Sequence, residues 1–132
     1  MKAGVGPVLS CRMDLFFRFD FAAARFLPQL PASHRCSRVH GHTFHIELTI
    51  RGELGEDSGW IVDFDDVDRA MLELKEALDH RQLNDVPGLE NPTTEKLAQW
   101  LWGQMAERFA GLYCVTVQEH PARGVRYFGP AA

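Results

Sequence analysis

Alternating apolar and polar positions predict that the chain begins and ends in β-strands. In residues 15–25 the odd-numbered positions are apolar up to position 23, and Arg25 shares their parity. Residues 40–52 alternate again, and one face of this segment carries Phe44, Ile46, Leu48 and Ile50. Two later segments, 113–119 and 124–128, show the same period of two. We therefore predict two strands near the start of the chain and two near its end.

Between these strands the apolar period lengthens to that of a helix. From position 64 onward, apolar residues at helical spacing are Phe64, Val67, Met71, Leu74 and Leu78. Aspartates at 65, 66 and 68 crowd the first turns, where the helix dipole favours negative charge. This pattern predicts a helix that ends near Asp79–His80. The run WIVDF at 60–64, just before it, is interpreted as a short strand or the end of one.

A second helix is predicted to begin in the sequence NPTTE at 91–95. Asn91 or Thr93 can cap it, and Pro92 suits a first turn, so this motif is assigned helix-start chemistry and no catalytic role. Its buried stripe is expected to be Leu97, Leu101, Met105 and Phe109. Two strands, two helices and two strands in this order indicate an α+β domain, in which the helices pack on an antiparallel sheet.

Composition narrows the classes of function. A chain of 132 residues with 45% hydrophobic residues forms one domain. We assign it to residues 13–132 and treat 1–12 as an N-terminal extension, with Met13 as an alternative start. The net charge of −4 disfavours a nucleic-acid binder, and no apolar run has the roughly 20 residues of a membrane span. The cysteines at 11, 36 and 114 are too scattered for a disulfide framework, which favours a soluble protein of the cytoplasm.

The stretch CSRVHGH, residues 36–42, holds the first candidate chemistry. His40 and His42 are two positions apart, so on a strand they point to the same side and could hold one metal ion, zinc above all. The other interpretation is that both imidazoles bond to nearby backbone carbonyls. Their parity is that of Phe44, which places them toward the buried face.

Cys36 lies in the loop before these histidines, close to Arg35 and Arg38. Cationic neighbours favour the reactive thiolate form of a cysteine. Two other interpretations remain open: a cysteine with no special role, or a small structural zinc site made by Cys36, His34, His40 and His42.

Two further places carry candidate chemistry. In Asp79–His80, at the end of the first helix, the carboxylate can fix the tautomer of the imidazole and tune it as a base. Glu119 shares the parity of Val115 and Val117, so it should face inward and needs a partner. That partner is either a ligand with two adjacent N–H donors or one of the arginines.

In combination these motifs are more specific than any one of them. The order CSRVHGHTF, GWIVDF, LDHRQLND, NPTTEKLA and VQEH resembles the 6-pyruvoyltetrahydropterin synthase family. VPGLENPT adds a likeness to its bacterial branch, the 6-carboxytetrahydropterin synthases of queuosine (7-deazaguanine) biosynthesis. The resemblance extends over roughly Phe16 to Tyr127.

The resemblance implies a T-fold (tunnelling fold), whose subunits assemble through their sheets into barrels, as trimers or hexamers with active sites between subunits. It implies that Cys36 is the catalytic base or proton shuttle, that Asp79 and His80 assist it, and that Glu119 anchors the amino-pyrimidine edge of a pterin. His40 and His42 are then zinc ligands. The implied reaction converts 7,8-dihydroneopterin triphosphate to 6-carboxytetrahydropterin, acetaldehyde and triphosphate. Elimination of triphosphate alone, as in 6-pyruvoyltetrahydropterin synthase, is the alternative.

The chain departs from the family pattern at Arg25, which stands where the resemblance implies a third histidine ligand. A guanidinium has no lone pair to give a metal. Three interpretations follow. In the first, zinc binds through His40, His42 and another ligand, either His34 or Cys36. In the second, zinc is absent and Arg25 is the fixed cation that holds a substrate oxygen or phosphate. In the third, the protein binds a pterin without catalysis.

Overall fold

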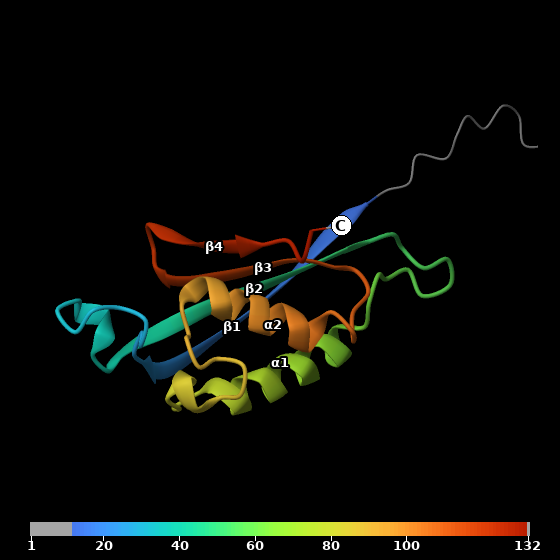
Figure 1. Cartoon of the computed structure of the whole chain (residues 1–132). Coiled ribbons are helices and arrows are strands. Elements are labelled where there is room, and N and C mark those ends of the chain that lie inside the picture. The colour runs from blue at the N-terminus through green and yellow to red at the C-terminus, as the bar shows by residue number, and fades with distance from the viewer. Residues whose placement is uncertain (1–11, 132) are drawn as a thin grey trace, which may run out of the picture.

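The computed structural model describes residues 12–131. The predicted N-terminal extension, apart from residue 12, and Ala132 lie outside the described residues. The elements follow one another as β1 (Met13–Arg25), η1 (Arg35–Ser37), β2 (His40–Gly52), α1 (Phe64–Leu78), η2 (Leu83–Asp85), α2 (Thr94–Met105), β3 (Leu112–His120) and β4 (Arg123–Tyr127). Figure 1 shows the long strands running behind the two helices.

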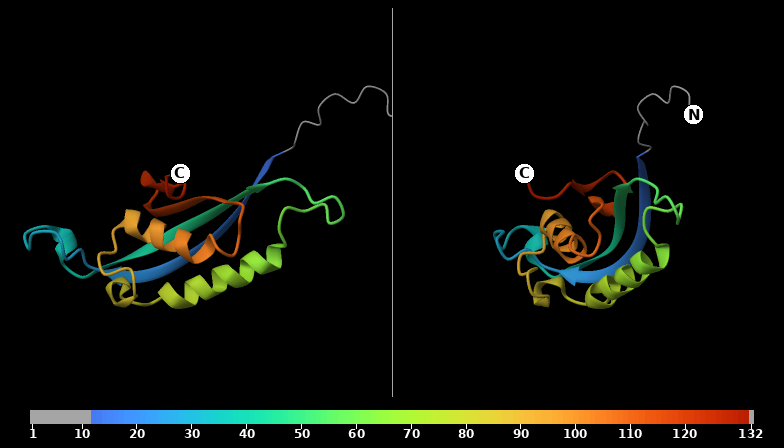
Figure 2. Two further views of the ribbon diagram at one scale, coloured as in Figure 1. Left: turned by 45° about the vertical axis from the view of Figure 1, so that its right-hand side comes forward. Right: turned by 90° about the vertical axis from the view of Figure 1, so that its right-hand side faces the viewer.

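The strands form one antiparallel sheet in the order β1-β2-β3-β4, and both helices cover the same face of it. β1 and β2 pair along their whole length, from Met13 opposite Gly52 to Arg25 opposite His40. The predicted α+β class and antiparallel sheet are therefore confirmed. Loops project from both ends of the sheet, with η1 at one end and residues 53–60 at the other (Figure 2). Within residues 12–131, no helix is long and apolar enough to cross a membrane.

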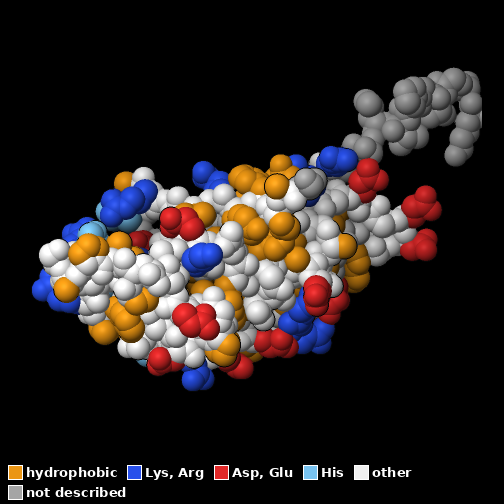
Figure 3. Space-filling model, in the orientation of Figure 1, with side chains coloured by type: hydrophobic (Ala, Val, Ile, Leu, Met, Phe, Trp, Pro, Cys, Tyr) orange, Lys and Arg blue, Asp and Glu red, His pale blue; other side chains and the backbone are white. Residues whose placement is uncertain are grey.

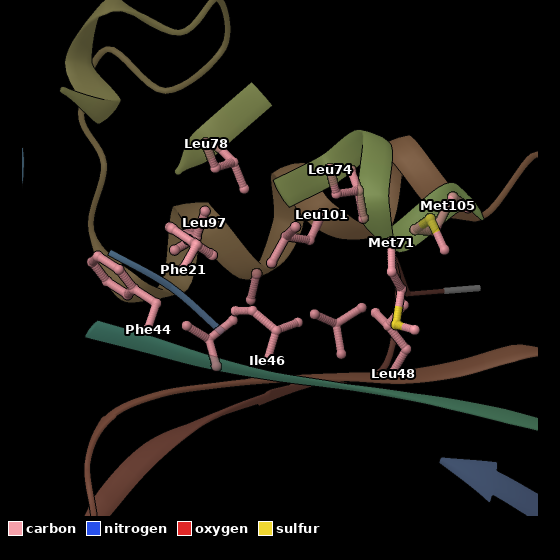
Figure 4. Packing of buried hydrophobic residues seen from close by; sticks show 14 of the residues in the cluster. Phe21, Phe44, Ile46, Leu48, Met71, Leu74, Leu78, Leu97, Leu101 and Met105 are labelled. Atoms are coloured by element: carbon pink, nitrogen blue, oxygen red, sulfur yellow. The ribbon is translucent and has the colours of Figure 1, made fainter. Parts of the chain in front are cut away.

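The core lies between the sheet and the helices, and the alternation in the strands determines which side chains enter it. Phe21 of β1 and Phe44 of β2 are directly opposite and their rings stack 5.0 Å apart. Figure 4 shows leucines and methionines of both helices packed against these strands. Within α1 and α2, the fully buried leucines are Leu78, Leu97 and Leu101. The inward faces predicted from periodicity are confirmed.

The start of α1 corrects the prediction for residues 60–64. WIVDF forms no strand; Trp60 to Asp63 is a loop, and the Asp63 carboxylate caps α1 by accepting the backbone N–H of Asp65. Ile61 and Val62 reach the core from this loop, so the apolar run reflects packing and not strand pairing. A short apolar run cannot by itself separate these two cases.

Two aromatic residues also depart from the predicted helical stripes. Phe64 is the first residue of α1 and is 58% exposed, although its ring meets that of Phe17 edge-on at 5.3 Å. Phe109 is buried as expected, but α2 ends at Met105 and Phe109 lies in the turn that follows. Thr93 caps α2, and Pro92 precedes the cap instead of occupying the first turn.

The segment that leaves α1 covers part of the outer edge of β1. The N–H of His80 donates to the carbonyl of Ala22 at 2.6 Å, and the N–H of Ala24 donates to the carbonyl of Arg81 at 2.9 Å. Gln82 then forms a parallel bridge with Ala24. Asp79–His80 is thereby fixed to the end of β1 that carries Arg25.

Candidate functional site

Arg25 is the buried charged residue at the end of β1, and it lies on the core face as its parity predicted. Its side chain is 4% exposed. It stands directly opposite His40 on β2, and its guanidinium lies 5.2 Å from the ring centre of Phe44. The alternation of apolar residues therefore continues into the site, where a cation takes the position of a hydrophobic side chain.

The guanidinium of Arg25 is held by three elements. Its Nη2 donates to Oε2 of Glu119 at 2.5 Å, and its Nη1 donates to the carbonyl of Pro92 at 3.2 Å and to the hydroxyl of Thr94 at 3.4 Å. These contacts join β1, β3 and the start of α2. Removing one partner of such a pair leaves an uncompensated charge, which typically costs about 3–5 kcal/mol when the pair is buried.

Glu119 faces inward, as its parity predicted, and an arginine of the same chain is its partner. Both hydrogen bonds that its carboxylate accepts from residues 12–131, from Arg25 and from Thr94 at 3.3 Å, go to Oε2. The side chain keeps 20% exposure. Oε1 therefore remains an acceptor for a ligand, on a carboxylate that an internal cation holds in place.

His40 and His42 lie on the same face, and their rings meet edge-on at 4.9 Å. Nδ1 of His40 lies 2.7 Å from the carbonyl of Arg38, so this nitrogen carries the proton and Nε2 carries a lone pair. That Nε2 is buried and has no hydrogen-bond partner among the described residues. Burial lowers the pKa of His42, with the charges of Arg25 and His40 adding to the effect and Glu119 opposing it.

The donor atoms of residues 12–131 do not complete a zinc site within one chain. A catalytic zinc ion takes three protein ligands and a fourth, open position. Among residues 12–131 no group of three or more His, Cys, Asp or Glu side chains is placed to hold a metal. Nδ1 of His34 instead accepts the backbone N–H of Cys36 at 3.1 Å. The suggested third ligand, His34 or Cys36, is therefore not supplied.

Cys36 lies in η1, half-buried, in the loop that projects beyond the sheet. His34, Arg35 and Arg38 are exposed around it, and Figure 3 shows arginine or lysine and histidine side chains together at this end of the molecule. The carbonyl of Cys36 accepts the N–H of Leu27, which ties η1 to the end of β1. Among the described residues no hydrogen bond links the thiol to Asp79 or His80.

Asp79 and His80 form a pair. Nδ1 of His80 lies 2.7 Å from Oδ2 of Asp79, and Oδ1 of Asp79 accepts the N–H of Ala22 at 2.9 Å. The Ala22 N–H, followed by the His80 imidazole, lowers the pKa of Asp79. His80 has a φ of 57°, a left-handed conformation that is uncommon outside glycine, and its side chain is 82% exposed.

An open groove brings His42 and His80 to one surface. It has a volume of about 600 Å³ and is lined by Ala22, Ala23, Ala24, Gly41, His42, Thr43, His80, Arg81 and Gln82. The structure thus brings the predicted residues together in two groups, Arg25 with Glu119 and His42 with His80. Among the described residues no hydrogen bond joins Cys36 to either group, and the bond from the N–H of Leu27 ties its loop to the end of β1.

Sequence reasoning missed three contributors. Thr94 and Pro92 belong to the motif that was given only a helix-start role, yet both bind Arg25. Asn84 bonds the backbone of Phe26 in both directions, accepting from its N–H at 3.0 Å and donating to its carbonyl at 2.8 Å. None of these roles follows from periodicity. The motif LDH-x-x-LN gave a signal for Asn84, whereas Thr94 occupies the unspecified position of NPT-x-E.

Comparison with known proteins gives a consistent result. The family model described as 6-pyruvoyl tetrahydropterin synthase matches residues 14–130. A 6-carboxy-5,6,7,8-tetrahydropterin synthase of Synechocystis sp. is 36% identical over 123 residues, which cover 88% of this chain and 93% of that protein. A putative 6-carboxy-5,6,7,8-tetrahydropterin synthase of Archaeoglobus fulgidus is 33% identical over 101 residues, or 76% of this chain and 83% of the relative.

Solved structures show the same fold. The 6-pyruvoyl tetrahydropterin synthase of Caenorhabditis elegans superposes with a TM-score of 0.84 and covers 92% of this chain and 98% of its own. Its sequence identity is 24%, so this likeness concerns the fold. The predicted T-fold subunit is confirmed.

Proposed function

The chain belongs to the 6-pyruvoyl tetrahydropterin synthase family, and from this premise we propose that it is a lyase of the 6-carboxytetrahydropterin synthase type. Its proposed substrate is 7,8-dihydroneopterin triphosphate, and its products are 6-carboxytetrahydropterin, acetaldehyde and triphosphate. The proposed place of this reaction is queuosine biosynthesis in the cytoplasm. The names of two relatives that this chain matches over most of its length support the carboxy branch.

The observation that carries the proposal is the inward carboxylate of Glu119 at one end of the sheet. Its Oε1 is available while Oε2 is held by Arg25 and Thr94. A carboxylate fixed in this way accepts hydrogen bonds from the amino-pyrimidine edge of a pterin, which presents neighbouring N–H donors. Glu119 is therefore the proposed pterin anchor.

Proton transfer is assigned to Cys36 with Asp79 and His80. The exposed arginines around Cys36 attract an anionic substrate. Asp79 fixes the imidazole of His80 through the 2.7 Å contact at Nδ1, so that Nε2 can accept or return a proton. Since no hydrogen bond within the described residues joins Cys36 to this pair, we propose that the site is completed between subunits.

The edge strands of the sheet support an assembly of several subunits. β1 and β4 are edge strands, and residues 80–82 cover β1 only near Ala22 and Ala24. Open edges readily pair with another chain. A trimer or hexamer that joins sheets into a barrel removes these edges and brings η1 of one subunit toward its neighbours.

Zinc is assigned no step here. His40 and His42 are the two nitrogen donors that would face a metal ion, but a third ligand is missing from the described chain. The proposed mechanism therefore uses only side chains that the structure positions.

The proposal is tested by incubating the purified protein with dihydroneopterin triphosphate and measuring acetaldehyde and triphosphate. Both products are expected from wild type, and a fall of at least 100-fold is expected for Cys36→Ala if the thiol carries the proton. Cys114→Ala is the matched control, because Cys114 is buried in β3, away from the site, and its loss should leave turnover intact. Triphosphate without acetaldehyde would favour the 6-pyruvoyltetrahydropterin synthase reaction instead.

A second candidate function is binding of a pterin without catalysis. The incomplete set of metal ligands favours it. Pterin binding by wild type, with no product under any metal condition, would select this function over the lyase.

A further inference from the structure

The end of β1 contains two buried polar atoms that the described chain leaves unpaired. They are Nε of Arg25, a hydrogen-bond donor, and Nε2 of His40, which is an acceptor because Nδ1 donates to Arg38. Arg25 and His40 are directly opposite each other on β1 and β2, with their side chains on the same face. Buried polar groups without partners are uncommon and usually indicate a ligand or an ordered water.

The character of these two atoms distinguishes between possible ligands. A metal ion could take the lone pair of His40, but it would leave the N–H of Arg25 unpaired and would add a second cation beside it. A hydroxyl group has the functions that both atoms need, because its oxygen accepts from an N–H such as that of Arg25 and its proton is donated to a lone pair such as that of His40. Within the described part of the chain, Glu119 supplies the only carboxylate bound to the guanidinium, and it is already used in their ion pair.

The electrostatics lead to the same conclusion. The three contacts of Arg25 fix its charge on the face where His40 and His42 lie. Like charges a few ångströms apart repel strongly when they are shielded from water. The carboxylate of Glu119 opposes this repulsion, but among residues 12–131 a divalent ion at the two imidazoles would find no third protein ligand.

We infer that Arg25 takes the place of both the third metal ligand and the metal's charge, and that it receives, together with His40, a side-chain hydroxyl of the pterin. The site then works without a tightly bound zinc ion. The hydroxyl part of this inference rests on the proposed function; the metal part does not.

Metal content tests the first part. Wild-type protein exposed to equimolar zinc and desalted is expected to retain well below one zinc per chain. Arg25→His supplies the missing ligand and removes the cation, so it is expected to retain at least tenfold more. Cobalt(II) is the spectroscopic probe: tetrahedral absorption bands should form with Arg25→His and not with wild type.

Arg126→His is the matched control. Arg126 is an exposed residue of β4 opposite Thr116, so the same change there should add no metal binding. About one zinc per wild-type chain after desalting would overturn the inference. So would a loss of melting temperature or of turnover when wild type is treated with EDTA.

Pterin selectivity tests the second part and remains available if Arg25→His does not fold. Wild type is expected to bind neopterin, which has side-chain hydroxyls, at least tenfold more tightly than 6-methylpterin, which has none. Arg25→Gln should lose most of that preference, with its fold checked by circular dichroism. Equal binding of both pterins by wild type overturns the hydroxyl contact. If wild type binds neither pterin, the hydroxyl contact falls with the proposed function, and metal content still decides whether Arg25 replaces the metal.

Discussion

Nδ1 of His80 lies 2.7 Å from Oδ2 of Asp79, while the other oxygen of Asp79 accepts the backbone N–H of Ala22. The pair is thus attached to β1 through a main-chain group and not only through side chains. Because the N–H of His80 also donates to the carbonyl of Ala22, the end of α1 and the edge of the sheet are fixed together. This attachment gives the pair a stability role as well as its proposed catalytic one.

The lowered pKa of Asp79 predicts a pH-dependent stability. Its causes, the Ala22 N–H first and His80 second, favour the carboxylate in the folded state. An unfolded aspartate has a pKa of about 3.9, so this stabilisation is complete above about pH 4 and is lost as pH falls through the lower, folded-state pKa. Asp79→Asn keeps an oxygen for Ala22 but has no charge to titrate.

Melting temperatures of both proteins from about pH 7 to about pH 2.5 check this. Near neutral pH the melting temperature of wild type should be higher than that of Asp79→Asn, and this difference should shrink below about pH 4. Asp57→Asn, in the exposed loop before α1, serves as the control for a change of one surface charge. A constant difference across the whole range would contradict the assignment.

The left-handed backbone of His80 predicts a difference between two substitutions. His80→Gly and His80→Ala both remove the imidazole, but only alanine is strained at a φ of 57°. We expect His80→Gly to be more stable than His80→Ala by about 1 kcal/mol, measured by urea unfolding. Both should lose turnover. Equal stabilities would show that the loop relaxes to another conformation once the imidazole is gone.

Periodicity predicted much of the site, because it reports on which side of a strand a residue points. Arg25 and Glu119 were expected to face inward on parity alone, and both do. That they bind each other could not be predicted, since 94 positions separate them and parity carries no information on distance. The wrong prediction at 60–64 did not come from missing long-range information. An apolar run was interpreted as a strand, although Asp63 within it is a local signal for the start of a helix.

Neither periodicity nor the resemblance assigned a role to Thr94 or Asn84. Thr94 at the start of α2 and Asn84 in η2 have polar side chains whose partners lie in distant segments, so no local pattern predicts their roles. The resemblance did not extend to Arg25, the position at which this chain departs from the family pattern, and only the contacts of its guanidinium show how the site is built instead.

The core between the sheet and the helices predicts a large effect for Leu101→Ala. Leu101 of α2 is completely buried, and its loss should lower the free energy of unfolding by about 2–5 kcal/mol. Leu72→Ala is the control, because Leu72 of α1 is 56% exposed and its change should stay within about 0.5 kcal/mol. Urea unfolding of both variants provides the measurement; similar values would place Leu101 outside the cooperative core.

The separation of Cys36 from Asp79 and His80 predicts complementation between inactive variants. Cys36→Ala and Asp79→Asn are each expected to be inactive. If one site takes Cys36 from one subunit and Asp79 from another, random reassembly of an equal mixture restores about a quarter of wild-type turnover. The mixture is dissociated and refolded together, and its oligomeric state is measured by size-exclusion chromatography. A mixture that stays inactive while forming the same oligomer would place both residues in one subunit's site.

Thr94 provides the sharpest test of how Glu119 is held. Its hydroxyl donates to Oε2 of Glu119 at 3.3 Å and accepts from Arg25 at 3.4 Å, so it joins both members of the ion pair. Thr94→Val removes this hydroxyl with little change of shape, and we expect pterin binding to weaken about tenfold, because one hydrogen bond to a charged group contributes roughly 1.5 kcal/mol. Thr94→Ser keeps the hydroxyl and should bind like wild type. Fluorescence titration with neopterin measures both. Thr93 and not Thr94 caps α2, so both variants should keep the start of the helix, and the lost hydrogen bonds should lower the melting temperature of Thr94→Val by a few degrees relative to Thr94→Ser. Wild-type affinity in Thr94→Val would show that Arg25 alone is sufficient to hold the Glu119 carboxylate in its binding position.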